Sequence, residues 1–114
     1  MVERRRVCGL VESSIREVSR IILTRPMTPR MVVSALRTLD RLMDTYERID
    51  CGLASAVVEK PVRDELCSRV RGIAEDVARA SLEAGRIRDP DTFTSLVYYS
   101  MRVSDRLGCG RLFE

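Results

Sequence analysis

Apolar residues recur at alternating spacings of three and four in four separate stretches of this 114-residue chain. This spacing places the apolar side chains on one face of an α-helix, whereas a half-buried strand would alternate at every second residue. Prolines and glycines separate the four stretches, and none of them shows strand-like alternation. The sequence therefore predicts an all-α fold with four principal helices, in a single domain that spans residues 1–114.

Two of the predicted helices begin with a capping residue followed by proline, at Thr28–Pro29 and at Asp89–Pro90. This pair of residues is typical of a helix start, because the cap satisfies a backbone N–H and proline needs none there. Residues 53–60 are ambiguous: they form either a short helix of their own or a kinked lead-in to the third helix. The predicted helices cover residues 3–24, 29–50, 62–85 and 90–108.

The breaks between the predicted helices are of modest length, which favours antiparallel neighbours. The predicted architecture is therefore an up-and-down antiparallel bundle. In that arrangement the first and third helices start at the same end at which the second and fourth helices finish.

The four cysteines fall toward that shared end. Cys51 and Cys109 follow the ends of the second and fourth helices, whereas Cys8 and Cys67 lie about one and a half turns inside the first and third, roughly 8–9 Å from the end. Matching these levels predicts the pairs Cys51–Cys109 and Cys8–Cys67, provided that each Cα pair lies within about 7 Å. If residues 53–60 continue the third helix, Cys67 moves about 12 Å away and its pairing fails.

Three interpretations of the cysteines stay open at this point. Free cysteine packs as a small apolar residue, so Cys8 and Cys67 can simply be buried. The even number of cysteines favours one or two disulfides. A zinc site with four thiolate ligands is the third interpretation, although such sites usually supply their ligands in closely spaced pairs and this chain has no C-x-x-C.

Arginines collect at the opposite end of the predicted bundle, where two helix N-termini also point. Helix N-termini carry partial positive charge and unpaired N–H groups, so this end is a candidate for binding a phosphate or another anion. Alternatively, Asp89 and Asp91 neutralise part of the charge and the arginines are simply solvated. The anion-binding candidates are Arg25, Arg30, Arg86 and Arg88.

Catalytic and metal-binding groups are scarce. The chain has no histidine, which is the commonest general base and metal ligand. Asp40, Asp44 and Glu47 share the second helix, but the apolar pattern places them on its outer face among arginines, as expected for a solvated surface of ion pairs. The sequence therefore predicts neither a catalytic site nor a bound metal or cofactor.

Composition indicates the habitat. The chain lacks asparagine and glutamine, and charged residues make up 32% of it, which fits a hyperthermophilic, archaeal source. Intracellular disulfides are common only in such organisms. No stretch approaches the ~20 apolar residues of a membrane span, and Glu12 interrupts the apolar segment that follows the basic N-terminus. We therefore expect a cytoplasmic protein without membrane contact.

The C-terminal half, IAEDVARASLEAGRIRDPDTFTSLVYYSMRVSDRLG, ends with Tyr99, then Asp105 six residues later, and then Leu107–Gly108. In these features it resembles an archaeal family called domain of unknown function 357. The chain departs from the family pattern directly after the aspartate, where Arg106 and Leu107 replace small residues. The resemblance implies an archaeal helical bundle without an established activity.

Two functional hypotheses follow. The first is a non-catalytic interaction or scaffold protein, either self-associating or a small subunit of a larger complex. It rests on the second helix, whose apolar stripe covers about half its circumference and exceeds what one helix seam requires. The alternative is a nucleic-acid-binding accessory protein that uses the arginine-rich end; the net charge of +3 permits this without requiring it.

Overall fold

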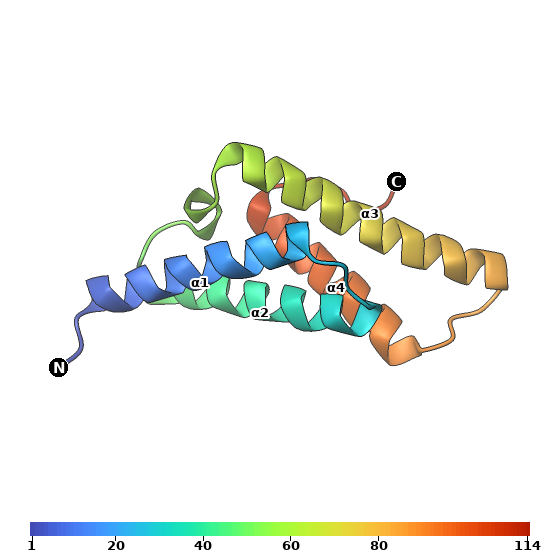
Figure 1. The fold of residues 1–114 in the computed structure, drawn as a ribbon, viewed down its shortest axis with the longest axis horizontal. Helices are drawn as coiled ribbons and strands as arrows, with labels where there is room; N and C mark the ends of the chain where they lie inside the picture. The colour runs from blue at the N-terminus through green and yellow to red at the C-terminus, as the bar shows by residue number, and fades with distance from the viewer.

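The computed structural model describes all 114 residues and consists of helices joined by linkers, without β-strands (Figure 1). The prediction of an all-α fold with four principal helices is confirmed. The segment that the sequence left open contains a short 3-10 helix of its own. In chain order the elements are α1 (Arg4–Thr24), α2 (Pro29–Arg48), the 3-10 helix η1 (Ala54–Val57), α3 (Lys60–Ala84) and α4 (Pro90–Leu107).

Local chemistry sets four of the eight boundaries of the α-helices. The side chains of Thr28 and Asp89 each accept a hydrogen bond from the backbone N–H three residues later, at 3.3 and 3.2 Å, and so cap α2 and α4. Gly85 and Gly108 follow α3 and α4 in the left-handed conformation, both with φ of 70°, which glycine adopts without steric cost. α2 ends at Arg48, two residues before the predicted end.

Consecutive helices reverse direction, but consecutive helices are not always neighbours. α2 packs mainly on α4 and α1, and α3 packs mainly on α4 and less on α1. The order around the bundle is therefore α1, α2, α4, α3, with α2 and α4 running in the same direction. Two ion pairs show this direction. Asp40 pairs with Arg102 and Asp44 pairs with Arg106, so the residue numbers of α2 and α4 increase in the same direction along the contact. The long linker at residues 49–59 carries the chain from α2 across to α3.

α3 is displaced along the bundle relative to α1. A groove between the two helices brings Val62 and Glu65, in the first turns of α3, beside Leu23 and Thr24 at the end of α1. The far end of α3 consequently projects beyond the other helices (Figure 1). The buried residues of α3 are Leu66, Val70 and Ala74, and none of the residues 75–84 is buried.

The core is centred on α2, whose apolar stripe is mostly buried, with Ala35 and Leu42 half-buried against the core. α2 contacts α1, α4 and η1, so its broad apolar face meets three elements of the same chain. These contacts account for the width of the stripe, which therefore does not support association; association itself stays a prediction. None of the helices combines the length and the apolar character needed to cross a membrane. The buried apolar residues of α2 are Val32, Leu36, Leu39, Met43 and Tyr46.

Candidate functional site

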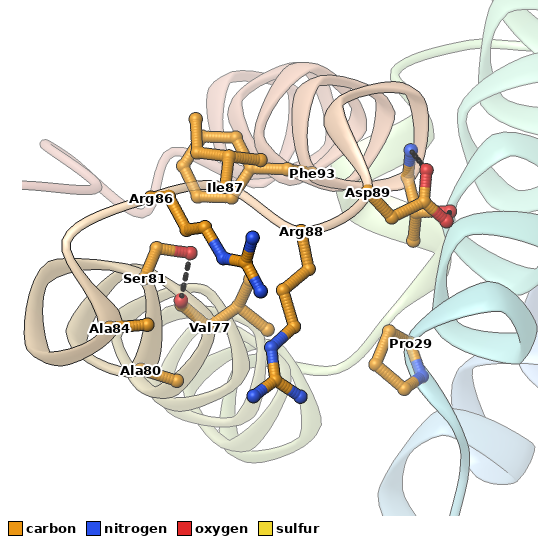
Figure 2. Close-up of a pocket in the computed structure, with 11 residues that line it drawn as sticks. Pro29, Val77, Ala80, Ser81, Ala84, Arg86, Ile87, Arg88, Asp89 and Phe93 are labelled. Atoms are coloured by element: carbon orange, nitrogen blue, oxygen red, sulfur yellow. Dashed lines mark hydrogen bonds between the residues drawn. The ribbon is translucent and has the colours of Figure 1, made fainter.

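A groove of about 410 Å³ lies where α3 turns into α4, and we call it the corner groove. The end of α3, the linker after it, the first turn of α4 and the start of α2 all contribute to its walls (Figure 2). Apolar side chains make up much of its surface, and two arginines extend over it. The residues that line it are Pro29, Val77, Ala80, Ser81, Ala84, Arg86, Ile87, Arg88, Asp89, Thr92 and Phe93.

The local sequence explains why the groove forms. Gly85 ends α3, and the backbone N–H of Arg86 then donates a hydrogen bond to the carbonyl of Ser81 at 3.1 Å, which closes the helix end. Only three residues then remain before Asp89 caps α4. This short linker crosses from one helix to the next with Arg86 and Arg88 at its two ends. The two arginines are therefore placed by backbone geometry and not by a carboxylate partner.

Arg86 and Arg88 both direct their side chains into the space between α3 and Pro29 (Figure 2). Neither arginine takes part in any ion pair or side-chain hydrogen bond of the structure, although other residues of the chain form ten ion-pair contacts. The corner groove therefore combines an apolar surface with two guanidinium groups whose donors are available to a ligand.

Asp89 is the carboxylate that lines the groove, and it is already engaged by Thr92 and Arg30. Its carboxylate accepts hydrogen bonds from the hydroxyl of Thr92 at 2.7 Å and from the N–H of Thr92 at 3.2 Å, and it lies 3.6 Å from the guanidinium of Arg30. The Thr92 hydrogen bonds are the main reason that the pKa of Asp89 lies below its ordinary value of 3.8, and the charge of Arg30 adds to the effect. Asp89 therefore stays ionised as a helix cap and leaves Arg86 and Arg88 without a partner.

The structure brings three of the four arginines proposed for anion binding to this corner. Arg86 and Arg88 line the groove, and Arg30 forms an ion pair with Asp89, which also lines it. Arg25 follows the last residue of α1 and is not among the lining residues. The N-termini of α2 and α4 contribute less than expected, because the Thr28 and Asp89 side chains already occupy first-turn N–H groups. Anion binding itself stays a prediction.

The prediction that Asp40 faces solvent is wrong. Asp40 is buried at the α2–α4 contact, where the Nε atoms of Arg106 and Arg102 approach its carboxylate oxygens to 2.8 and 3.4 Å. Arg106 also donates to Asp44 and to Glu47, both at 2.9 Å. The sequence signal was the four-residue spacing of Arg102 and Arg106 on α4, which matches that of Asp40 and Asp44 on α2.

Ionisation in this cluster follows from the contacts. Burial disfavours the charge of Arg106, but hydrogen bonds to Asp40 and Asp44 outweigh it, so the pKa of Arg106 lies above its ordinary value. The hydrogen bond from Arg106 is in turn the main reason that the pKa of Asp44 lies below 3.8. Arg106 and Asp44 therefore favour the charged forms of each other. The cluster is thus a structural connection between α2 and α4.

All four cysteines form disulfides, Cys8 with Cys51 and Cys67 with Cys109. The prediction of disulfides is therefore confirmed, whereas free thiols and a four-thiolate zinc site are contradicted. The predicted pairing is wrong, because each disulfide joins the two helices of one antiparallel pair: α1 with the chain after α2, and α3 with the chain after α4. The Cα atoms of the pairs lie 5.6 and 5.4 Å apart.

The displacement of α3 explains why level matching failed. Glu65 lies beside the end of α1, and Cys67 follows two residues later. Ser19 of α1 lines the same groove as Glu65. Cys8 lies eleven residues before Ser19, which corresponds to about 16 Å along α1. Cys8 and Cys67 therefore cannot meet, and the four cysteines do not gather at one end of the molecule as expected.

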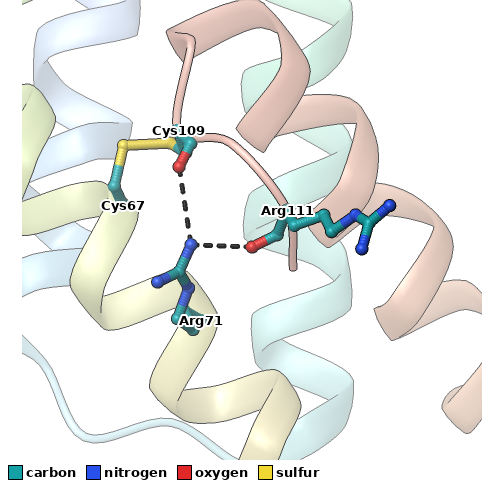
Figure 3. The surroundings of a disulfide bond; sticks show 4 residues. All are labelled: Cys67, Arg71, Cys109 and Arg111. Carbon is teal, nitrogen blue, oxygen red and sulfur yellow. Dashed lines mark hydrogen bonds between the residues drawn. A yellow bond between two sulfur atoms is a disulfide. The ribbon is translucent and has the colours of Figure 1, made fainter. Parts of the chain in front are cut away.

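The Cys67–Cys109 disulfide has a hydrogen-bonding neighbour that sequence reasoning missed. Arg71, one turn after Cys67, donates to the backbone carbonyls of Arg111 at 2.7 Å and Cys109 at 3.5 Å (Figure 3). Together the disulfide and Arg71 hold the segment after α4 against α3, and Leu112 of this segment is buried. The four-residue spacing of Cys67 and Arg71 was the available signal.

Comparisons with protein-family models, with curated proteins and with solved structures find no match to this chain. The resemblance of the C-terminal half to domain of unknown function 357 therefore stays a prediction.

Proposed function

We propose that this protein is a non-catalytic interaction protein that binds a protein partner through the end of α3 and the corner groove. The supporting observation is that residues 75–84 include no buried residue, although they form the last turns of the longest helix. Apolar residues nevertheless continue to the tip, where Leu82 is 82% exposed and Ile87, in the linker beyond, is 42% exposed.

Physical chemistry makes this exposure informative. Helices in proteins are stabilised mainly by packing of their apolar face, and in this projecting end Val77 packs against the core whereas Leu82 does not. Full burial of one large aliphatic side chain is favourable by about 1.5–3 kcal/mol. A partner that covers Ile87 together with the apolar walls of the groove would gain a contribution of this kind, and exposed apolar surface at one place is typical of an interaction site.

The polar groups of the groove support binding in preference to catalysis. The hydroxyl of Ser81 donates to the carbonyl of Val77 at 3.0 Å, within the same helix, and no base lies next to it among the lining residues. Asp89 has a lowered pKa, which makes its carboxylate a weak proton acceptor near neutral pH. These groups can position a partner, but they lack the nucleophile and base that bond cleavage requires.

The charge of the surface favours a different protein as the partner over a second copy. A symmetric interface would place the same patch of both copies face to face. Arg86 and Arg88 of each copy would then meet, and like charges that oppose each other at an interface are unfavourable. We therefore propose that the chain is a small subunit that associates with an unlike partner.

Site-specific photo-cross-linking tests this function. A photoreactive phenylalanine analogue in place of Phe93, a half-buried residue that lines the groove, is expected to yield one discrete product in cells that make the protein, with the partner identified by mass spectrometry. The same residue at Ser14, exposed on α1, should yield none. Ile87→Ser should weaken the product, whereas Leu10→Ser, which changes an exposed apolar residue outside the groove, should not. The absence of a product from Phe93, or equal products from both positions, would contradict the proposal.

Nucleic-acid binding is the second candidate function. The observation that supports it is the unpaired state of Arg86 and Arg88, close to Arg30. This function predicts affinity for an oligonucleotide that falls steeply as salt rises, because phosphate contacts release counterions. The apolar surface of the groove supports it less well, since phosphate backbones are bound by polar and charged groups.

A further inference from the structure

We propose that the corner groove binds an acidic peptide segment in which one large apolar side chain is flanked by carboxylates. This inference rests on the proposed function and specifies the chemistry of the partner. Three features of the groove support it: the floor, the two arginines and the single carboxylate.

The floor of the groove can accept a large apolar side chain. Ala80 and Ala84 lie one turn apart on α3 and leave space above the helix, while Ile87 and Phe93 form the opposite wall (Figure 2). The groove volume of about 410 Å³ falls in the range of pockets that bind small ligands, roughly 300–1,000 Å³. A phenylalanine or leucine side chain of a partner therefore fits as an anchor between α3 and α4.

The arginines define what must flank that anchor. Arg86 and Arg88 reach the groove from the same linker and lack carboxylate partners. Guanidinium groups pair with carboxylates through two parallel hydrogen bonds, which adds geometric specificity to the attraction. Two such carboxylates, one on each side of the anchor, would also relieve the repulsion between two neighbouring positive charges.

The carboxylate of Asp89 argues against a nucleic acid in the same place. It lines the groove, its side chain is 47% exposed, and it is held in its charged form as the cap of α4. A phosphate chain would meet this charge and would leave the apolar floor uncovered. A peptide can place its apolar anchor on the floor and its carboxylates on Arg86 and Arg88, away from Asp89.

Fluorescence anisotropy with a labelled peptide tests the inference. The probe has a central phenylalanine flanked by two glutamates on each side. We expect it to bind the full-length protein, and its affinity to fall about tenfold in the Arg86→Ala/Arg88→Ala double variant, as two exposed ion pairs are lost. Ala80→Phe should also weaken binding, because it fills the floor at an exposed position without touching the core.

Matched controls separate this site from general charge attraction. Arg37→Ala/Arg41→Ala removes the same charge from exposed positions of α2 that form no ion pair, and should leave the affinity unchanged. A peptide with serine in place of phenylalanine, and one with glutamine in place of glutamate, should both bind more weakly.

Three results would overturn the inference: no binding of the probe, equal binding of the serine peptide, or tighter binding of an oligonucleotide than of the probe. A discrete cross-link from Phe93 to a partner without an acidic segment would overturn this inference alone and leave the interaction function standing. Loss of that cross-link would instead contradict the function itself.

Discussion

At the scale of single residues, Tyr46 shows how one polar group is accommodated in the core. Its ring is buried, and its hydroxyl donates a hydrogen bond of 2.6 Å to Glu12, which connects α2 to α1. This hydrogen bond, and burial after it, raise the pKa of Tyr46 above its ordinary value of 10.0. The phenol therefore holds its proton more tightly in the native state than in the unfolded chain.

Stability at alkaline pH should depend on this residue. A raised folded-state pKa contributes stability that is complete below the unfolded value of 10.0 and is lost as the pH rises through the folded value. We expect the Tm of the wild type to fall above about pH 10 more steeply than that of Tyr46→Phe, measured by circular dichroism. Below that pH, Tyr46→Phe should lower the free energy of unfolding by about 1 kcal/mol, because one hydrogen bond is lost.

Tyr98→Phe is the control for this prediction, because Tyr98 is 54% exposed and its hydroxyl forms no hydrogen bond. It should reproduce the pH dependence of the wild type. If Tyr46→Phe shows the same alkaline decline as Tyr98→Phe, the contribution assigned to the Tyr46 hydroxyl is wrong.

At the scale of elements, the contact between α2 and α4 is the most extensive in the molecule, and ion pairs set its register. Arg106 is only 15% exposed and meets three carboxylates of α2 on successive turns. Because burial of a charge is unfavourable unless it is paired, any other register of α4 on α2 would leave Asp40 or Arg106 buried without a partner. Because they are largely buried, these ion pairs constrain how α4 packs on α2 more strongly than exposed ion pairs would.

Removal of Arg106 should therefore be costly. We expect Arg106→Ala to lower the free energy of unfolding by about 2–3 kcal/mol in urea denaturation, since Asp40 stays buried with only Arg102 nearby. Arg48→Ala should change stability much less, because the Arg48 side chain is 78% exposed when it pairs with Asp44. Equal effects of the two substitutions would show that the buried cluster contributes no more than a surface pair.

The same contact has an acid dependence. Because the folded pKa of Asp44 lies below 3.8, its contribution to stability is present above that pH and is lost as the pH falls through the folded value. The Arg106→Ala variant should lose less additional stability in this acid range than the wild type does.

At the scale of the whole molecule, two disulfides and an axial displacement define the shape. The molecule measures 54 by 27 by 23 Å, which is longer than its longest helix because α3 is displaced relative to α1. Each disulfide joins one antiparallel helix pair, across 43 and 42 residues of chain. Neither disulfide joins the two pairs to each other, so side-chain packing and the ion pairs of Arg102 and Arg106 hold α2 against α4.

Loop closure predicts similar stabilisation by both disulfides. For loops of this length the constraint on the unfolded chain corresponds to about 4 kcal/mol each. We expect Cys8→Ser/Cys51→Ser and Cys67→Ser/Cys109→Ser to lower the free energy of unfolding by similar amounts. Only the second variant should increase hydrogen exchange at residues 109–112, because it releases the segment that carries the buried Leu112.

Peptide mapping without reductant checks the pairing itself. The expected products are two cross-linked pairs, Cys8 with Cys51 and Cys67 with Cys109, and alkylation should label all four cysteines only after reduction. Recovery of Cys8 linked to Cys67 would contradict the arrangement of the helices as well as the pairing.

Much of the local structure could be predicted from the sequence, because it depends on residues a few positions apart. Apolar spacing identified all four helices, and Thr28 and Asp89 marked two starts that the structure confirms as caps. The same reasoning placed Arg86 and Arg88 at a corner between helices, since a glycine and a proline bound that corner. The two arginines of the candidate site could therefore be predicted from the sequence alone.

Tertiary structure decided which faces meet. Periodicity shows that a helix has an apolar face, but it does not show what that face contacts, so the order α1, α2, α4, α3 could not be derived from it. That order buries Asp40, separates Cys8 from Cys67 and leaves residues 75–84 projecting. By itself the sequence determined the extent of each helix to within two residues, because hydrogen bonds within a few residues control most of these boundaries. The packing of side chains distant in the chain determined the pairing of cysteines and the apolar half of the groove.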